Sequence, residues 1–327
     1  MSTQWSALVE LSPGSIDLIG DVHGELLPLI ELLRLLGYVH IDPADGQSPS
    51  HPQQRRLLFL GDYIDRGPDS PGVVRLVQHL VDSGIALALM GNHDLNAAEG
   101  RRKRENAWLF GHKPLHAAER AVANQGERDR IIAFLRTLPL AAARADLRAV
   151  HACWDDASIA ALATCGDPVL GIEGFRQVLT LRHGDEDSTP IAALLHQNEN
   201  PLKVITSGPE MAAPAPFFAG GRMRSEARRA WWNDYDANIM VVFGHYWRIP
   251  SPTLQKNDGL FPAGPLNATL GSGNAMCIDY SVGSRASERL ICTPPDKITG
   301  RLAALRWPQR ELVFDNGERM GLLSPQS

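Results

Sequence analysis

The sequence predicts an α/β protein with a βαβαβ core. Three apolar runs, at residues 16–20, 56–60 and 85–90, have the length of buried strands, and helical patterns separate them. Each run leads into a glycine and a polar side chain, in the pairs Gly20-Asp21, Gly61-Asp62 and Gly91-Asn92. Parallel strands joined by helices bring their carboxyl ends to one edge of a sheet, so we expect these polar residues to lie together.

The composition is that of an ordinary globular protein. The chain has 327 residues, 44% of them hydrophobic and 21% charged, and we expect a single domain over residues 1–327. A formal net charge of −5 offers no general attraction to duplex nucleic acid or anionic membranes. No apolar run approaches the ~20 residues that span a bilayer. The four cysteines are scattered and the N-terminus shows no secretory signal, so we expect reduced thiols and a cytoplasmic location.

The connections between the first strands follow in order. Apolar residues at helical spacing predict a helix over about 25–36, which Gly37 ends. Residues 41–55 are rich in proline, glycine and serine and are predicted to form a loop. A second helix is predicted over about 71–83, and the third strand follows it.

Residues 95–145 differ in character from the core. Alanine and arginine dominate, and 118–138 is predicted to form one or two helices. We therefore expect a helical cap, inserted at about 95–145, to lie over the opening of the site. The basic run 101–104 either attracts an anionic substrate or simply forms a solvated helix face.

The second half of the chain contributes two more strands that lead to a histidine. Residues 147–150 precede His151, and residues 239–243 precede Gly244-His245. The rest is predicted as peripheral helices over 155–200, a strand at 203–206, an arginine-rich loop near an anion over 207–235, and antiparallel strands at 276–280, 302–305 and 312–314.

The side chains at the strand ends form a metal-ligand set. They are Asp21, His23, Asp62, Asn92, His151 and His245. Carboxylate, imidazole and amide without thiolate suit Mn²⁺ first, with Fe or Zn²⁺ as alternatives, and several imidazoles disfavour Mg²⁺ or Ca²⁺. A single Gly-Asp usually marks a turn and a single histidine is usually structural, but five strands that all end in this way are hard to obtain by chance.

The order of the ligands suits two ions. Asp21 and His23 are two apart on an extended segment, so both side chains can reach one ion. Asp62 can bridge to a second ion, which Asn92, His151 and His245 complete. Two ions ~3.5–4 Å apart would clamp a phosphoryl group and activate a water for in-line attack.

Further polar residues fit the same chemistry. Arg66 offers a planar fork for phosphate, and we expect Asn92 and His93 to contact the phosphate as well. His93 is the candidate general acid for the leaving group. Asp65 is the preferred residue to orient His93, with Asp94 as the alternative.

Three stretches resemble the signature blocks of the calcineurin-like metallophosphoesterases, namely residues 20–24, 61–67 and 91–94. The ending Asp65-Arg66-Gly67 resembles the phosphoprotein phosphatase branch, which includes bacterial serine/threonine phosphatases and diadenosine tetraphosphate hydrolases. His151 and His245 match the later histidine motifs, so the likeness spans about 20–281.

The resemblance implies a two-sheet β-sandwich flanked by helices, with a dinuclear centre at one end. It implies Asp21, His23 and Asp62 on one metal, with Asp62, Asn92, His151 and His245 on the other. It also implies an acid pair of His93 with Asp65, and Arg66 on phosphate. The sequence departs from the family at Asp94, where Glu is usual, and after His151. A second phosphate-binding arginine has three candidates: Arg222, Arg224 and Arg248.

The predicted function is hydrolysis of phosphomonoesters by water activated at two metals. A phosphorylated protein is the first substrate candidate, which would make the chain a serine/threonine phosphatase. The alternative substrate is a dinucleoside polyphosphate such as diadenosine tetraphosphate. The remote alternative is a binding module without catalysis, but no ligand position is missing. No membrane or duplex nucleic-acid partner is expected.

Overall fold

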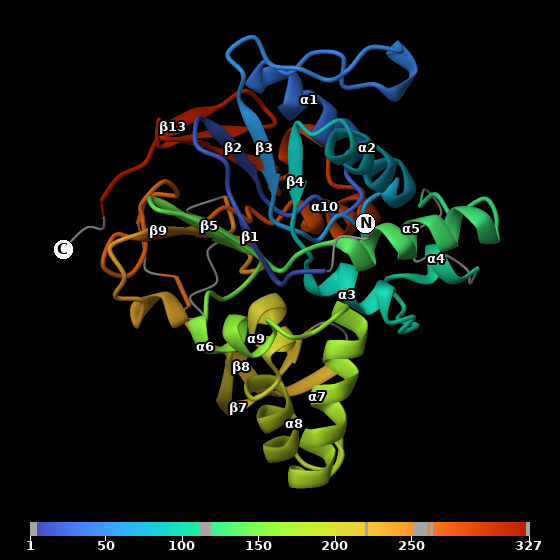
Figure 1. The fold of residues 1–327 in the computed structure, drawn as a ribbon, viewed down its shortest axis with the longest axis vertical. Coiled ribbons are helices and arrows are strands. Elements are labelled where there is room, and N and C mark those ends of the chain that lie inside the picture. The colour runs from blue at the N-terminus through green and yellow to red at the C-terminus, as the bar shows by residue number, and fades with distance from the viewer. Residues whose placement is uncertain (1–4, 112–118, 220–221, 251–259, 262–263, 325–327) are drawn as a thin grey trace.

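Two β-sheets packed face to face form the centre of the computed structural model, which describes residues 5–111, 119–219, 222–250, 260–261 and 264–324 (Figure 1). The six-stranded sheet has the order β13 (Arg319–Gly321), β12 (Glu311–Phe314), β11 (Ala303–Trp307), β2 (Ile16–Ile19), β3 (Arg56–Phe59), β4 (Ala86–Ala88). The five-stranded sheet has the order β1 (Leu8–Glu10), β5 (Ala141–Arg144), β6 (Leu147–Val150), β9 (Met240–Phe243), β10 (Ala275–Cys277). The expected two-sheet sandwich is confirmed.

Two helices cover the outer face of the six-stranded sheet, as expected. They are α1 (Leu26–Leu36) and α2 (Ser70–Asp82). Helix α1 ends at Gly37, whose φ of 101° favours glycine. Helix α2 begins after Asp69, whose carboxylate accepts the N–H of Gly72 at 2.8 Å. Both connections run between parallel neighbours, β2 to β3 and β3 to β4, which is the predicted βαβαβ unit.

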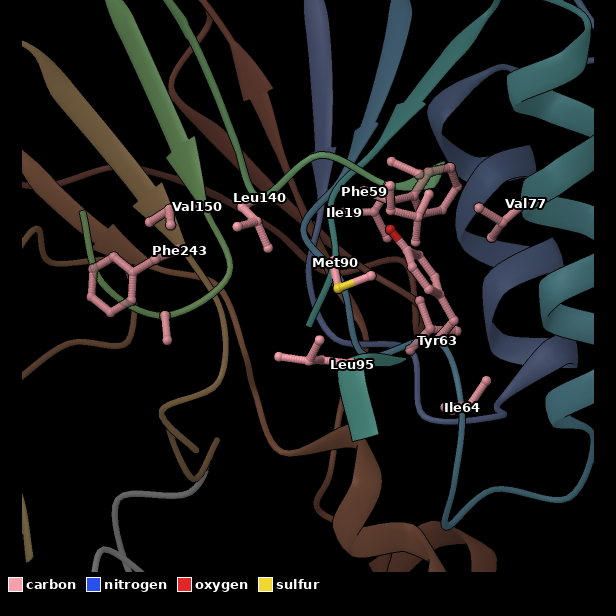
Figure 2. Close-up of a cluster of buried hydrophobic side chains, with 14 of the residues drawn as sticks. Ile19, Phe59, Tyr63, Ile64, Val77, Met90, Leu95, Leu140, Val150 and Phe243 are labelled. Atoms are coloured by element: carbon pink, nitrogen blue, oxygen red, sulfur yellow. The ribbon is translucent and has the colours of Figure 1, made fainter. Parts of the chain in front are cut away.

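Alternation along the central strands builds two layers of core. Leu18 and Leu58 belong to the cluster between the sheets, together with Val242 of β9. Ile19 and Phe59 point the opposite way, into the cluster beneath the helices, and Figure 2 shows them facing Val77 of α2. Since both faces of these strands are buried, their sequences are mainly apolar rather than alternating, and the buried Asp17 within β2 is paired with Arg55.

The range 95–145, expected to hold a helical cap, contains several kinds of structure. Its helices are the end of α3 (Asn92–Ala98), α4 (Ala107–Phe110) and α5 (Gln125–Thr137), and its last residues form β5 of the five-stranded sheet. Residues 112–118 lie outside the described part of the chain. Among the residues that are described, no helix is both long and apolar enough to cross a membrane.

Residues 156–228 form a separate group of elements, which we call the lobe (Figure 1). It consists of α6 (Asp156–Ala161), α7 (Pro168–His183), α8 (Pro190–Asn198), α9 (Pro201–Ser207), β7 (Glu210–Ala219) and β8 (Arg222–Arg228). Helices α7 and α9 contact α3, so the lobe packs beside the carboxyl end of β4.

Two predictions within the lobe were wrong. Residues 203–206 lie in helix α9 and not in a strand, because Asn200 caps the helix by accepting the N–H of Leu202 and Pro201 occupies its first turn. The stretch 207–235 is mainly the antiparallel hairpin of β7 and β8 rather than a loop. Gly220-Gly221 between two extended runs was the sequence signal for such a hairpin.

The C-terminal strands are antiparallel only in part. Strands β11 and β12 pair antiparallel, as expected. Strand β10 pairs parallel with β9, because the chain crosses over between them and does not turn back directly. Helix α10 (Arg285–Leu290) then leads from the second sheet to the first.

Candidate metal centre

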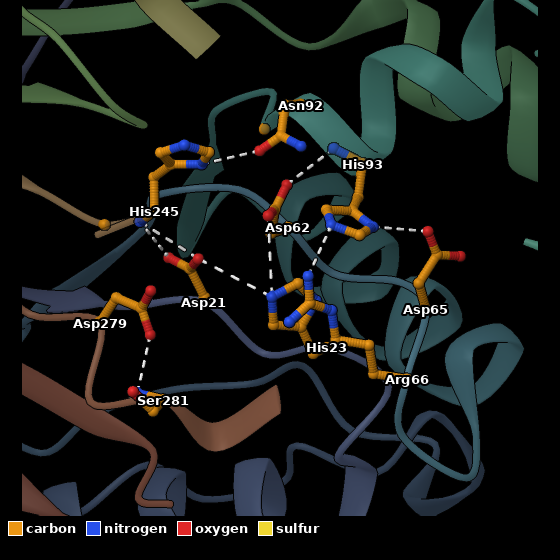
Figure 3. A network of polar contacts seen from close by, with 12 residues as sticks. Asp21, His23, Asp62, Asp65, Arg66, Asn92, His93, His245, Asp279 and Ser281 are labelled. Atoms are coloured by element: carbon orange, nitrogen blue, oxygen red, sulfur yellow. Dashed lines mark hydrogen bonds and ion pairs between the residues drawn. The ribbon is translucent and has the colours of Figure 1, made fainter. Parts of the chain in front are cut away.

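The candidate ligands gather at the carboxyl ends of β2, β3, β6 and β9 and at the start of α3 (Figure 3). The first two strand ends are tied together through the backbone. The N–H groups of Val22 and His23 both donate to the carbonyl of Asp62, at 3.0 and 2.8 Å. Left-handed backbone recurs here, with φ of 46° at His23, 52° at Asp62 and 65° at His245. Non-glycine residues in this region store strain, and such strain concentrates at functional sites.

Close packing requires the glycine that precedes two of the candidate ligands, Asn92 and His245. A Cβ atom on Gly91 would clash with the carboxylate and backbone of Asp62. A Cβ atom on Gly244 would clash with Oδ1 of Asp21. These glycines let strand ends approach so closely that a carboxylate from one lies against the backbone of the next.

One half of the candidate centre is built around His23. Its Nε2 lies 3.9 Å from Oδ2 of Asp21 and 3.7 Å from Oδ2 of Asp62. Its Nδ1 lies 3.1 Å from the carbonyl of Ile64, so Nε2 is the nitrogen turned toward the carboxylates. Both oxygens of Asp21 also accept the N–H of His245, at 3.1 and 3.2 Å.

The other half is built around Asn92. Its Oδ1 lies 2.8 Å from Nδ1 of His245 and 3.3 Å from Nε2 of His151. Nε2 of His151 is also 3.4 Å from Oδ1 of Asp62, and its Nδ1 is fixed 3.0 Å from the carbonyl of Leu60. Asp62 therefore has one oxygen toward each half, the position that a bridging ligand requires.

The residues present fit two divalent ions. Donor atoms of Asp62, His151 and His245 all lie within 4.8 Å of one another, and so do those of Asp62, His23 and His93, although His93 is the candidate acid and not a candidate ligand. All five side chains are buried. The second ring nitrogen of His23 and of His151 faces a carbonyl, an arrangement that orients metal-binding imidazoles.

Burial and neighbouring charges set the protonation of several candidate ligands. Burial and then the neighbouring Arg66 hold the pKa of His23 well below its usual value, and burial and Arg228 do the same for His245. Both imidazoles are thus neutral, as ligands must be. Burial opposes ionisation of Asp62, but the imidazoles of His151 and His93 hold its pKa well below the usual range.

His93 and Asp65 form a pair beside the ligands. Nδ1 of His93 is 2.6 Å from Oδ2 of Asp65, and Nε2 of His93 is 3.3 Å from Nη2 of Arg66. Burial tends to lower the pKa of His93, but Asp62 and Asp65 raise it above its ordinary value. Asp94 does not face His93, because its carboxylate accepts the N–H groups of Asp62 and Gly91 at 2.7 and 2.9 Å.

Two tryptophans complete this side of the site. Nε1 of Trp108 donates to Oδ1 of Asp65 at 2.7 Å, so both carboxylate oxygens have partners. The guanidinium carbon of Arg66 lies 4.4 Å from the ring centroid of Trp247, which is 36% exposed. Sequence reasoning found neither residue. Trp247 had a weak signal, since it is two positions after His245, and Trp108 had none.

A pocket of about 460 Å³ extends from the ligands into the lobe. Asn92 and His245 line one end of it, and α8, β7 and β8 supply most of the rest. Arg228 lines it as well and donates to the carbonyl of His245 at 3.0 Å. The lobe, expected to be peripheral, thus walls the space beside the candidate centre.

The three candidates for a second phosphate-binding arginine are placed differently. Arg224 lines the pocket, but its Nη2 pairs with Glu210 at 3.1 Å. Arg248 is buried, and its Nη1 lies 3.4 Å from the carbonyl of Cys277. The side chain of Arg222 is outside the described part of the structure. Arg228, which was not among the candidates, contacts a candidate ligand residue directly through its bond to the carbonyl of His245.

The two-sheet sandwich and its cluster of carboxylate and imidazole side chains are the arrangement of the metallophosphoesterase fold. Residues 14–246 match the calcineurin-like phosphoesterase family, and the chain belongs to that family.

The curated relatives are named for nucleotide hydrolysis. A bis(5'-nucleosyl)-tetraphosphatase PrpE (asymmetrical) of Oceanobacillus iheyensis is 46% identical over 78 residues, covering 24% of this chain and 30% of that protein. A symmetrical bis(5'-nucleosyl)-tetraphosphatase of a Marinomonas species is 29% identical over 182 residues, covering 52% of this chain and 57% of that protein. The chain thus spans less than two thirds of these relatives.

Solved structures share the fold at low sequence identity. A protein serine/threonine phosphatase from Saccharomyces cerevisiae has a TM-score of 0.51 at 14% identity, over 99% of this chain and 86% of that one. A cold-active protein-tyrosine phosphatase of a Shewanella species has a TM-score of 0.51 at 15% identity, over 98% of this chain and 83% of that one.

Proposed function

We propose that this chain hydrolyses dinucleoside polyphosphates at a centre of two divalent ions, Mn²⁺ before Fe or Zn²⁺. Asp21, His23 and Asp62 would hold one ion, and Asp62, Asn92, His151 and His245 the other. The observation that carries the proposal is Asp62, whose two oxygens face the two halves of the ligand set. When bound, the ions would supply Lewis acidity to the phosphoryl group and activate the attacking water.

Residues around the candidate ligands would bind the phosphate and protonate the leaving group. Arg66 would bind the phosphate, because its guanidinium lies beside both His93 and the candidate metal ligands. His93 would give a proton from Nε2 to the leaving oxygen, while Asp65 at Nδ1 keeps the imidazole charged and oriented. Arg228 would add a second positive charge from the pocket side.

Three features support a nucleotide substrate. The pocket beside the ligands is walled by the lobe, which suits a compact molecule more than a peptide that must enter and leave as an extended chain. Trp247 presents a partly exposed indole beside the phosphate-binding Arg66, and exposed aromatic rings stack nucleobases. The relatives named above are bis(5'-nucleosyl)-tetraphosphatases.

A phosphoserine or phosphothreonine peptide is the second candidate. The pocket wall carries four carboxylates, from Glu186, Asp187, Glu210 and Glu226. Glu186 and Glu210 are paired with Lys203 and Arg224. The remaining negative charge of Asp187 and Glu226 would repel a polyphosphate and attract basic residues around a phosphorylated side chain.

A hydrolysis panel separates the two candidates. Mn²⁺-loaded protein is given diadenosine tetraphosphate, a phosphopeptide with basic flanks, an aryl phosphomonoester and an aryl phosphodiester, and kcat/KM is compared. We expect the tetraphosphate to give the highest value. A higher value on the phosphopeptide would replace the nucleotide by a protein substrate, and no turnover of any compound would refute the proposed activity.

A further inference from the structure

A second buried carboxylate lies beside Asp21 and outside the ligand set. Asp279 follows β10, is 1% exposed, and appears next to Asp21 in Figure 3. Its Oδ1 accepts the N–H of Ser281 at 2.8 Å. Its Oδ2 is buried and has no hydrogen-bond partner among the described residues. A buried polar atom without a partner is rare in folded proteins and requires an explanation.

The backbone fixes Asp279 in this place. The carbonyl of Asp279 accepts the N–H of Arg248 at 2.9 Å, and the preceding N–H of Ile278 donates to Phe243 at 2.8 Å. On the other side, a Cβ atom on Gly20 would clash with the carbonyl of Ile278. The strand end that carries Asp21 is thus in direct backbone contact with the one that carries Asp279.

The proximity of two carboxylates has an electrostatic cost. The side chains of Asp21 and Asp279 are almost fully buried and lie next to each other, and like charges repel more strongly where water is excluded. Arg228 and Arg66 act on Asp279 at a distance, yet neither bonds its free oxygen. A divalent cation held by Asp21 would remove this repulsion and give the free oxygen an electrostatic partner.

We propose that Asp279 is a positioning residue of the metal centre, whose free carboxylate oxygen faces the half formed by Asp21, His23 and Asp62 and strengthens cation binding there. This inference rests on the two-ion centre proposed above. It assigns Asp279 a role through charge and not through direct contact with the phosphate.

The variant Asp279→Asn tests the proposal, because it retains the size and the acceptor for Ser281 and removes the charge. Mn²⁺ is titrated calorimetrically into chelator-treated protein, and the melting temperature of the metal-free protein is measured. We expect about tenfold weaker binding, the usual scale for residues that support metal ligands. We also expect a higher melting temperature, since the repulsion between two buried carboxylates is relieved.

Asp315→Asn is the matched control. Asp315 is also a carboxylate with little exposure, but it pairs with Arg285 at 2.6 Å. Its replacement should lower the melting temperature and leave the Mn²⁺ affinity unchanged. If Asp279→Asn does not fold, Asp279→Ser, which retains an oxygen acceptor, takes its place.

Unchanged Mn²⁺ affinity in the folded variant, whatever its melting temperature, would overturn the proposal and reduce Asp279 to a turn-forming residue. Failure of the native protein to bind Mn²⁺ would instead refute the centre itself, so the two failures are distinguishable.

Discussion

The imidazole of His93 and the carboxylate of Asp65 are 2.6 Å apart, and a different element holds each of them. The backbone N–H of His93 donates to Oδ1 of Asp62 at 3.0 Å, which links the pair to the candidate bridging ligand. Trp108 of α4 holds Asp65 from the far side. The proposed proton donor is therefore positioned relative to the candidate metal ligands by a short chain of contacts.

Replacement of His93 by Ala should separate proton donation from metal binding. We expect kcat on substrates with poor leaving groups to fall by about 10²- to 10⁴-fold, the range for loss of a general acid. Aryl phosphates, whose leaving groups need less protonation, should lose much less. His183→Ala, at a histidine that pairs with Glu199, is the control. Equal losses on both substrate types would refute the role of His93 as acid.

Replacement of Trp108 by Phe should weaken the acid pair indirectly. The change removes the N–H that bonds Asp65 and leaves a buried acceptor unpaired, at a cost of about 1–3 kcal/mol. We expect reduced turnover together with a lower free energy of unfolding in urea. Trp154→Phe, which removes a comparable bond to Asp156, should leave turnover unchanged. Full activity of Trp108→Phe would show that the bond from Trp108 to Asp65 does not support the acid pair.

Metal affinity should rise with pH because of His151. Burial alone would lower the pKa of this imidazole, but the carboxylates of Asp62 and Asp21 raise it to about 10 in the metal-free protein. His151 therefore carries a proton at pH 7 that must leave when a metal binds. Since the metal-free state binds more protons, raising the pH toward 10 favours binding.

Calorimetry in buffers of different ionisation enthalpy measures this release. His151 should release about one proton per chain when Mn²⁺ binds at neutral pH. Above the raised pKa of His151 this release should no longer occur. Binding of Mn²⁺ without any proton release at pH 7 would show that His151 is neutral beforehand or is not a ligand.

The exposed indole of Trp247 should matter only for substrates that carry a base. Base stacking on an aromatic ring is worth about 1–3 kcal/mol, so Trp247→Ala should raise KM for diadenosine tetraphosphate by about 5- to 150-fold. An aryl phosphomonoester serves as the control substrate and Trp247→Phe as the control variant, and both should behave nearly as the native enzyme does. A similar loss on both substrates would mean that Trp247 acts only by packing on Arg66.

The core of the fold and the gathering of ligands could be predicted because both depend on local signals. The run at residues 57–60 is buried on both faces and is therefore apolar throughout, and the glycine after it is required because a Cβ atom there would clash with Gly91. The family resemblance supplied the pairing into two sheets, which no single strand reveals.

The lobe could not be predicted in the same way. Residues 203–206 contain β-branched side chains typical of strands, but the cap at Asn200 and the packing of α9 on α6 and α7 favour a helix. The contact of Trp108 with Asp65 joins residues that are far apart in the sequence, and no periodic pattern in the sequence predicts it. The pocket, which Arg228 and α8 line, exists only once the lobe is folded.

Metal stoichiometry tests whether two ions share Asp62. Native protein and Asp62→Asn are stripped, reloaded with Mn²⁺, passed through a desalting column and analysed for manganese by mass spectrometry, with hydrolysis measured on the same samples. We expect two ions per native chain, and we expect Asp62→Asn to lose both metal retention and activity while its fold is preserved. Active native protein with one ion or none, or an Asp62→Asn variant that retains two, would contradict this expectation.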